Sequence, residues 1–314
     1  MFVIVEGIDR VGKTTLCNML EKNGFITLKD AFGQLYDTSD AEFPFFSVGK
    51  LDTAIQYIKK LCDKGFNIVA DRLHITEFVY GTIDRGTAPD LDAIKKLDEE
   101  ISSMFGFDVT LILVTPTDVD EASERACHDL TFHDTLFTHF FEASTIKRKL
   151  KTDFFHLNDA VKAIVARAFT YDFYFASPFF RPDQVEREER LKTHLRLLGY
   201  RVFSPKESCH LESTADPDSQ DAVFNDNVES IKKSAAVFAI TDTKDMGTIW
   251  EAGYAYGVGK PIIYYAETLG ENLFNLMLAK SGRTVCKSQD EVTKELLDAV
   301  LYKGEGTIFG GQIE

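Results

Sequence analysis

Residues 2–20 read FVIVEGIDRVGKTTLCNML. An apolar run, Phe2 to Val5, leads into a glycine-bearing turn, and apolar residues at helical spacing follow from Leu16 to Leu20. The turn, Gly7 to Thr14, fits the pattern G-x-x-x-x-G-K-[ST], which binds phosphates when a strand precedes it and a helix follows. This segment therefore predicts a strand, a phosphate-binding loop and a helix.

The residue types of this loop suit a nucleoside triphosphate. Gly7 and Gly12 allow backbone N–H groups to turn toward phosphate oxygens, and the following helix adds its positive N-terminal end. Lys13 is placed to reach the β- and γ-phosphates, and the Thr14 hydroxyl is a ligand for Mg²⁺. ATP and Mg²⁺ are the expected cofactors of this half of the chain.

Strand and helix signals alternate on either side of the loop. Further short apolar runs lie at 25–28, 66–70 and 108–114, and helical stretches lie at 51–62, 91–104 and 159–168. This alternation predicts a parallel sheet covered by helices. The fold class is α/β, beginning with a P-loop domain that resembles the nucleoside-monophosphate-kinase type.

The cycle restarts at Asp172 with a strand that runs into a proline turn, followed by a charged helix from Gln184 to Leu198. Three more strands are expected at 201–203, 235–241 and 261–265, and two helices at 223–233 and 248–258. A chain of 314 residues suits two modules. We expect a P-loop domain at 1–169 and a second doubly wound, flavodoxin-like domain at 170–314.

Composition limits the partners. A net charge of −15 argues against general nucleic-acid binding, which depends on Lys and Arg, although small anionic nucleotides can still bind locally. There is no signal-like start and no membrane-length apolar run, so we expect a cytoplasmic protein with no membrane contact. The five scattered cysteines fit a reducing compartment. We interpret Cys127, His128 and His133 as packed or solvated side chains rather than metal ligands.

The string from Val5 to Thr15 resembles the thymidylate kinase and deoxynucleoside kinase group, and the resemblance extends over most of residues 2–168. It implies that Asp71 orients the acceptor or a metal-bound water and that Arg72 neutralises charge in phosphoryl transfer. A surface ion pair is the alternative for Asp71 and Arg72. Three more side chains are expected near the acceptor pocket: Glu77, Tyr80 and Arg85.

The helix from Asp118 to Arg125 resembles the one that leads into the lid of these kinases, which makes Arg125 a candidate cation over ATP. A solvated Arg125 is the alternative. The expected ATP-binding set is Gly7, Asp9, Gly12, Lys13, Thr14, Thr15 and Arg125. The lid expected at 128–134 is poor in arginine, and Lys29-Asp30-Ala31-Phe32 stands where the group has Glu-Pro. The acceptor therefore stays open between nucleoside, monophosphate and modified base, and a nucleotide-sensing regulator is a further alternative.

Asp245 and Glu251 lie six residues apart around a glycine turn, with Asp245 in a loop and Glu251 in the first turns of a helix. Paired carboxylates suit glycosyl transfer, because one attacks the sugar carbon while the other protonates the departing base. The alternative is that Glu251 is a solvated glutamate on a helix without a catalytic role.

Four motifs resemble those of nucleoside 2-deoxyribosyltransferases, in the same order, over nearly all of residues 171–290: Tyr174 to Phe180, Phe224 to Ile231, Asp245 to Glu251, and Asn275 to Met277. The resemblance implies that Glu251 forms a covalent deoxyribosyl intermediate, that Asp245 handles the base proton, and that Tyr174 orients Glu251. It further implies a nucleoside-binding set of Tyr174, Phe180, Asp226, Asn227, Asn275 and Met277. Asn227 departs from an aspartate common in the family, so base recognition can differ or the register can slip to Asp226.

In that family a neighbouring subunit supplies the residues that match Asn275 and Met277, which implies a homo-oligomer. A sibling family cleaves deoxynucleoside 5′-monophosphates, and the segment from Asn275 to Met277 favours the free 5′-hydroxyl pattern over it. The preferred interpretation is a bifunctional nucleotide-salvage enzyme acting on deoxynucleosides, nucleobases and nucleotides. Its alternative is a C-terminal hydrolase with a regulatory P-loop domain.

Overall fold

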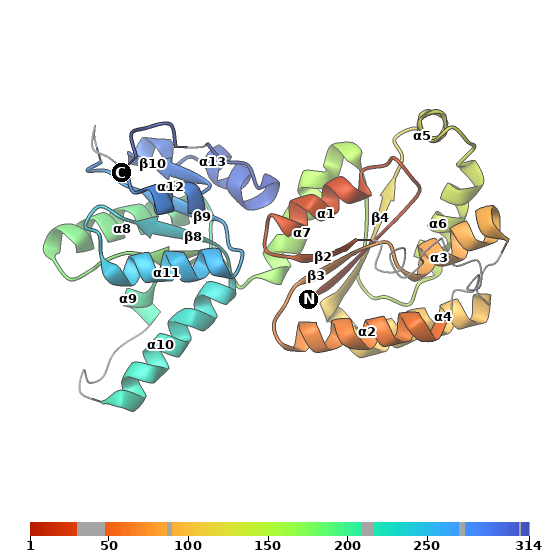
Figure 1. The fold of residues 1–314 in the computed structure, drawn as a ribbon, viewed down its shortest axis with the longest axis horizontal. Coiled ribbons are helices and arrows are strands. Elements are labelled where there is room, and N and C mark those ends of the chain that lie inside the picture. Colours follow the sequence, from red (N-terminus) through yellow and green to blue (C-terminus); the bar gives the residue numbers. More distant parts are fainter. Residues whose placement is uncertain (30–47, 87–89, 209–215, 270–273, 308, 314) are drawn as a thin grey trace. The chain divides into compact units, whose positions relative to one another are not determined.

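The computed structural model describes residues 1–29, 48–86, 90–208, 216–269, 274–307 and 309–313. The chain forms two compact units, one of Met1–Glu21 and Phe25–Val161, the other of Lys22–Gly24 and Lys162–Glu314. Each unit has its own parallel five-stranded sheet (Figure 1). The prediction of two successive α/β domains is confirmed.

The sheet of the first unit has the strand order β2-β3-β1-β4-β5. Its strands are β1 (Phe2–Glu6), β2 (Ile26–Lys29), β3 (Ile68–Asp71), β4 (Val109–Thr115) and β5 (Lys149–Asp153). The three central strands are buried along almost their whole length, which is why they read as continuous apolar runs.

Helices cover both faces of this sheet, with α1 (Lys13–Glu21) on one face and α2 (Val48–Asp63) and α4 (Leu91–Phe105) on the other (Figure 1). The remaining helical segments are α3 (His74–Tyr80), the π-helical η2 (Gly81–Arg85), η3 (Gly106–Asp108), α5 (Val119–Ala126), α6 (Thr131–Ala143), η4 (Phe154–His156) and α7 (Leu157–Ala168). The lid expected at 128–134 is thus largely the start of a helix, α6. The loop after β1 meets the residues after β3 and β4 at the carboxyl edge of the sheet, where α/β proteins bind ligands.

The sheet of the second unit has the order β10-β9-β8-β6-β7, the flavodoxin-like arrangement. Its strands are β6 (Tyr171–Ala176), β7 (Val202–Phe203), β8 (Ser234–Ile240), β9 (Ile262–Tyr265) and β10 (Thr284–Cys286). The direction of strand order changes between β6 and β8, so residues after these two strands are well placed for a site.

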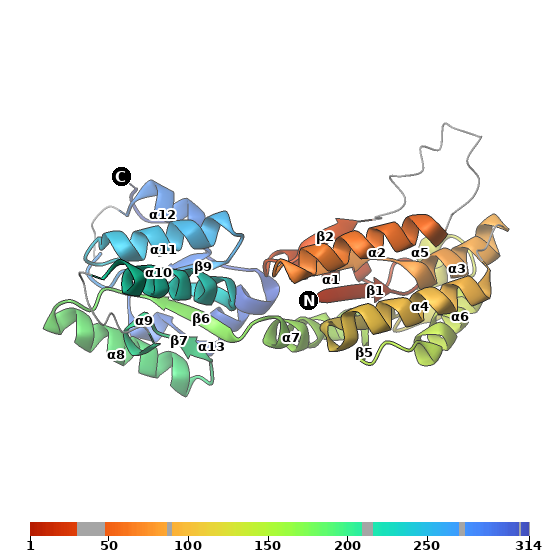
Figure 2. The ribbon, with the colours of Figure 1, turned by 90° about the horizontal axis from the view of Figure 1, so that it is seen from below.

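One face of this sheet is covered by α10 (Pro217–Lys232) and α11 (Met246–Gly257), and the other by α8 (Pro182–Leu197) (Figure 2). Ile231 of α10 and Ala252 and Ala255 of α11 contribute to the core on the first of these faces. The smaller segments are α9 (Pro205–Ser208), α12 (Leu276–Ser281), η5 (Gln289–Glu291), α13 (Lys294–Asp298) and η6 (Ala299–Lys303). No helix in the described part of the chain is long and apolar enough to cross a membrane.

Candidate active sites

The loop after β1 depends on its two glycines. Gly7 and Gly12 have φ angles of 137° and 102°, values that residues with a β-carbon rarely adopt. A β-carbon on Gly7 would lie 2.3 Å from the carbonyl oxygen of Val114, so this position also requires the close approach of two backbones. The turn around the phosphate site is therefore possible only with glycine at these positions.

Lys13 begins α1 and is almost completely buried. Its Nζ donates a hydrogen bond to the carbonyl oxygen of Ile8 inside the loop and lies 3.8 Å from Asp9 Oδ1. Burial, together with the positive charge of Arg72, lowers the pKa of Lys13 to about 8. The ammonium group is thus held in the loop, where phosphate oxygens would restore its favourable electrostatic environment.

Thr14 and Asp71 form a pair suited to a cation. The Thr14 hydroxyl donates to Asp71 Oδ2 at 2.9 Å. The other carboxylate oxygen, Asp71 Oδ1, is buried and has no hydrogen-bond partner among the described residues. A buried unsatisfied carboxylate oxygen beside a hydroxyl fits Mg²⁺ or a metal-bound water, because hard cations prefer oxygen ligands.

Arg72 follows Asp71 with a φ of 77°, an unusual value for a residue with a side chain. Its guanidinium forms an ion pair with Asp9 and lies 5.6 Å from the centre of the Tyr80 ring. Asp9 therefore contacts two cations: Lys13, which follows the loop after β1, and Arg72, which follows β3.

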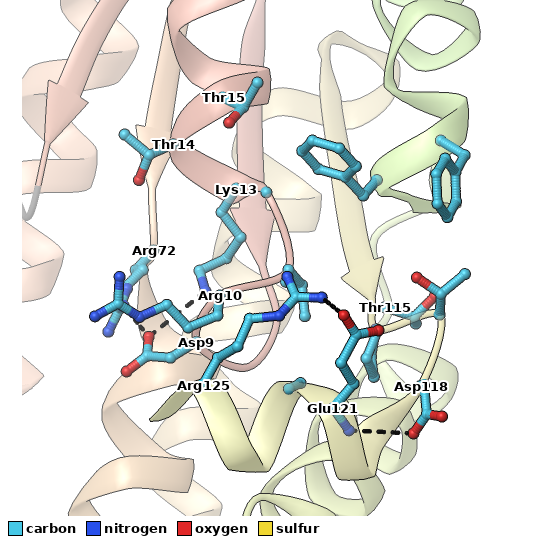
Figure 3. A pocket seen from close by; sticks show the side chains of 17 residues that line it. Asp9, Arg10, Lys13, Thr14, Thr15, Arg72, Thr115, Asp118, Glu121 and Arg125 are labelled. Atoms are coloured by element: carbon cyan, nitrogen blue, oxygen red, sulfur yellow. Dashed lines mark hydrogen bonds and ion pairs between the residues drawn. The ribbon is translucent and has the colours of Figure 1, made fainter. Parts of the chain in front are cut away.

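A cavity of about 710 Å³ opens over this loop, and Figure 3 shows the side chains that line it. Arg125 of α5 lines the cavity as expected, but its guanidinium is paired with Glu121 one turn earlier. Arg10, in the loop itself, also lines the cavity and has a left-handed φ of 66°. Arg10 is a candidate phosphate-binding cation that the sequence reasoning missed. The usable signal was a positively charged residue within the predicted phosphate-binding loop.

The expected acceptor residues are only partly described. Glu77 is buried on α3, and Tyr80 is half-buried at its end. The side chain of Arg85 lies outside the described residues. So do residues 30–32, which belong to the segment that replaces the Glu-Pro motif of the kinase group. Among side chains that are described, no cluster of three His, Cys, Asp or Glu could hold a metal. His133 Nε2 instead lies 3.0 Å from Asp84 Oδ1.

In the second unit, Tyr174 and Glu251 meet in the space between β6 and α11. Tyr174 is fully buried on β6, and its hydroxyl donates to Glu251 Oε1 at 2.6 Å. Loss of solvent around the carboxyl group raises the pKa of Glu251 to about 7; the Tyr174 hydrogen bond opposes this shift, and the negative charge of Asp245 adds to it. Glu251 is therefore a carboxyl group poised to exchange a proton near neutral pH.

Asp245 is the N-cap residue of α11. Its Oδ2 accepts hydrogen bonds from the Thr248 backbone N–H at 2.8 Å and the Thr248 hydroxyl at 3.0 Å. The preceding residue, Lys244, has a left-handed φ of 51°, which turns the chain from β8 into the cap. The predicted arrangement of Asp245 before the helix and Glu251 within it is observed.

Aromatic side chains lie on α10, on α11 and in the loop after β6. Trp250 stacks on Tyr254 with ring centres 5.5 Å apart, and Phe224 of α10 lies 5.3 Å from Trp250. Phe180 is 75% exposed and stacks on Phe179. These rings offer apolar faces for a nucleobase.

Polar groups position the neighbouring loops. Asp226 is exposed on α10, and Asn227 is half-buried beside it. Gln184, which the sequence reasoning missed, accepts from the backbone N–H groups of Phe180 and Arg181 and donates to Thr243 Oγ1 at 3.3 Å. Gln184 thereby connects the loop after β6 with the loop after β8.

Asn275 and Met277 lie at the start of α12. Asn275 is the N-cap of α12, and Met277 is 73% exposed. Both line a cavity of about 630 Å³ together with Met246 and Ile249, and the lining of this cavity includes neither Tyr174 nor Glu251. Lys244 and Met246, which flank Asp245 in the sequence, line the same cavity, so Asn275 and Met277 lie near the loop that carries Asp245.

The model of the family "Nucleoside 2-deoxyribosyltransferase" matches residues 173–289. A solved 2-deoxyribosyltransferase from the psychrotolerant bacterium Bacillus psychrosaccharolyticus is 32% identical; the alignment covers 38% of this chain and 88% of that one, with a TM-score of 0.36. The C-terminal half of the chain belongs to the nucleoside 2-deoxyribosyltransferase family. The matched range of this deoxyribosyltransferase domain contains both members of the carboxylate pair.

The N-terminal half is similar to a different group. A thymidylate kinase of Halothermothrix orenii is 27% identical over 146 residues, which are 40% of this chain and 69% of that protein. A solved structure of the YorR protein of Bacillus subtilis, in complex with phosphorylated GDP, is 12% identical; the alignment covers 63% of this chain and 98% of that one, with a TM-score of 0.35. The chain thus joins a thymidylate-kinase-like domain to a deoxyribosyltransferase domain.

Proposed function

We propose that the chain is a bifunctional nucleotide-salvage enzyme in which the deoxyribosyltransferase domain exchanges bases on 2′-deoxyribose and the kinase-like domain phosphorylates a deoxynucleoside or its monophosphate. The observation that supports the first activity best is the hydrogen bond from Tyr174 to Glu251. This hydrogen bond fixes a half-buried carboxylate near a second carboxyl group, Asp245, at the switch point of the sheet.

In the first step, a Glu251 carboxylate oxygen attacks C1′ of the deoxynucleoside, and the bond between C1′ and the base nitrogen breaks. Asp245 supplies a proton to the departing base. In the second step, a nitrogen of the acceptor base attacks C1′, the bond to Glu251 breaks, and Asp245 accepts the proton. Tyr174 keeps Glu251 oriented throughout.

In the kinase-like domain, the backbone N–H groups of the loop and Lys13 would bind the phosphates of ATP. Thr14 and Asp71 would hold Mg²⁺, which supplies positive charge against the phosphate oxygens. Arg72 and Arg10 would neutralise the charge that develops as the γ-phosphoryl group passes to the acceptor oxygen. Asp71 orients the acceptor or a metal-bound water.

The deoxyribosyltransferase site is proposed to be completed by a second copy of the chain. Asn275 and Met277 line a cavity whose lining does not include Glu251, and we propose that a neighbouring copy brings these two residue types to the sugar. Exposed apolar side chains lie in the same region, since Met246 and Met277 are both more than 70% exposed. Burial of these side chains would favour a homo-oligomer.

The test is incubation of the purified protein with deoxyinosine and a panel of free bases, without ATP, followed by chromatography. New deoxynucleosides that appear only with an acceptor base, and that disappear with Glu251→Ala, support base exchange; the same products then serve as acceptors in an ATP-dependent assay. Release of base from deoxynucleoside monophosphates, without exchange, would instead identify a hydrolase.

A further inference from the structure

The carboxylate of Glu6 links the end of β1 to the start of α3. Glu6 is 1% exposed and immediately precedes the phosphate-binding loop. Its Oε1 accepts hydrogen bonds from the backbone N–H groups of Leu73 at 3.0 Å and Ile75 at 3.2 Å, and its Oε2 accepts one from the Thr76 hydroxyl. One buried side chain therefore satisfies three donors of a segment far along the sequence.

Ile75 is the second residue of α3, and its N–H group is one that a helix start normally satisfies with a local cap. Leu73 occupies the N-cap position of α3, and its apolar side chain makes no cap hydrogen bond. Leaving the first N–H groups of a buried helix without acceptors is costly. Glu6 thus acts as a remote cap for α3.

Arg72 directly precedes this capped start. Its backbone N–H donates to the carbonyl oxygen of Val5 at 2.9 Å, and its φ of 77° is unfavourable for a residue with a side chain. Such a conformation persists only where neighbouring contacts hold it. Val5 holds the near side of Arg72 and Glu6 holds the residues after it, so both ends of the strained turn are tied to β1.

We infer that Glu6 is the positioning residue for Arg72: by capping α3 from the adjacent strand, it keeps the left-handed turn that places the Arg72 guanidinium against Asp9 at the mouth of the phosphate-binding loop. The inference rests on the proposed phosphoryl transfer for its catalytic consequence. Its structural content is independent of any activity. Glu6 itself touches no phosphate and is not a catalytic residue.

The variants follow from the hydrogen bonds. Glu6→Ala removes the acceptor of all three donors. Glu6→Gln keeps an amide oxygen for Leu73 and Ile75, and its NH₂ group can donate to the Thr76 hydroxyl, so it preserves the cap without the charge. Asp90→Ala is the matched control, because Asp90 caps α4 of the same unit by accepting from Asp92 N–H.

The first measurement is the NMR signal of the Arg72 Nε–H group in the full-length protein, assigned by its loss in Arg72→Lys. A held guanidinium gives a dispersed signal, and we expect it to move to the position of solvated arginines in Glu6→Ala. The signal should stay in place in Glu6→Gln and Asp90→Ala. An unmoved Arg72 signal in Glu6→Ala would overturn the inference, and so would an equal shift in Asp90→Ala.

The second measurement is phosphoryl transfer to the best acceptor. We expect Glu6→Ala to lower kcat by on the order of tenfold or more, because a small displacement of a catalytic group strongly slows the chemical step. The KM for ATP should change little. Glu6→Gln should recover most of the loss, and Glu6→Ala should add little to Arg72→Ala in the double variant. Multiplied losses in the double variant would contradict positioning through Arg72. If the unmodified protein transfers no phosphate, the proposed kinase function fails, while the NMR result still decides the role of Glu6.

Discussion

Glu251 and Asp71 show how one side-chain type is prepared for two different tasks. Glu251 is half-buried and close to another carboxyl group, so its pKa is raised to about 7 despite the hydrogen bond from Tyr174. Asp71 has one oxygen bound by Thr14 and one oxygen unsatisfied among the described residues. The first environment suits covalent attack with proton control near neutral pH, and the second suits a cation.

The pH dependence of base exchange is a prediction at this scale. Glu251 must be ionised to attack, so kcat/KM should rise as pH increases through the Glu251 pKa near 7. Tyr174→Phe removes the hydrogen bond that favours the ionised form, so the pKa should rise and the acid limb should move to higher pH. The loss of activity will then be larger at pH 6 than at pH 8.5.

The measurement is the pH profile of kcat/KM for deoxyinosine. Tyr171→Phe, on the same strand, is the control and should leave the limb in place. A limb that stays fixed or moves to lower pH in Tyr174→Phe would show that Tyr174 does not stabilise the ionised nucleophile.

The sequence indicated several of these residues because their signal is local. Lys13 and Thr14 belong to a contiguous pattern, and Asp245 and Glu251 are separated by a single turn and the start of a helix. Glu6 and Gln184 could not be found in this way. Their roles depend on hydrogen-bond partners that only the fold brings near, such as the Leu73 N–H donor for Glu6 and the Thr243 hydroxyl acceptor for Gln184.

At the scale of elements, the start of α11 performs two tasks with one side chain. Asp245 caps the helix through Thr248, and the same carboxyl group is proposed to handle the base proton. Replacing it by asparagine or alanine separates these tasks, because asparagine caps helices about as well as aspartate and alanine does not.

We expect Asp245→Asn to keep the thermal stability of the domain and to lose most of its base exchange. Asp245→Ala should lose the exchange and also about 1 kcal/mol of unfolding free energy. Denaturant unfolding of both variants, beside exchange assays, measures the two effects. Full exchange activity in Asp245→Asn would exclude Asp245 as the proton donor.

Element boundaries were predicted best where one strand is buried on both faces. β1 and β4 have this character and were expected close to their observed positions. β5 (Lys149–Asp153) was not predicted. It lies at the edge of the sheet, and three of its five residues are charged, so it has no continuous apolar run. α10 begins at Pro217, earlier than expected, because Asp216 and the proline supply a start signal ahead of the apolar pattern.

At the scale of the whole molecule, the two sheets share no strand, and each proposed site is built from one sheet. The division between the units falls within α7, and the domain boundary expected after residue 169 stays a prediction. Sites of this kind should respond separately to substitution.

We expect Glu251→Ala to abolish base exchange and to leave phosphoryl transfer within about twofold, and Lys13→Ala to do the reverse, since each proposed site is built within its own unit and effects at independent sites are additive. Both activities are measured on the same preparations. Loss of both in either variant would contradict independent modules.

The proposed oligomer gives a further prediction. Met277→Glu places a charge on an exposed apolar side chain and should lower both the oligomeric mass and the rate of base exchange, while phosphoryl transfer persists. Light scattering with both assays measures this, and Lys280→Glu, on the same short helix, is the charge control. An unchanged mass and an unchanged exchange rate would show that Met277 serves no shared site.

Trp250 is the sole tryptophan of the chain, and it lies one residue before Glu251, stacked on Tyr254. Its indole is therefore a built-in fluorophore for one of the two domains. Excitation at the red edge of protein absorbance should report nucleoside and base binding directly, without a label. Because the thymidylate-kinase-like domain has no such chromophore, titration of one ligand can be followed optically while the other domain is turning over.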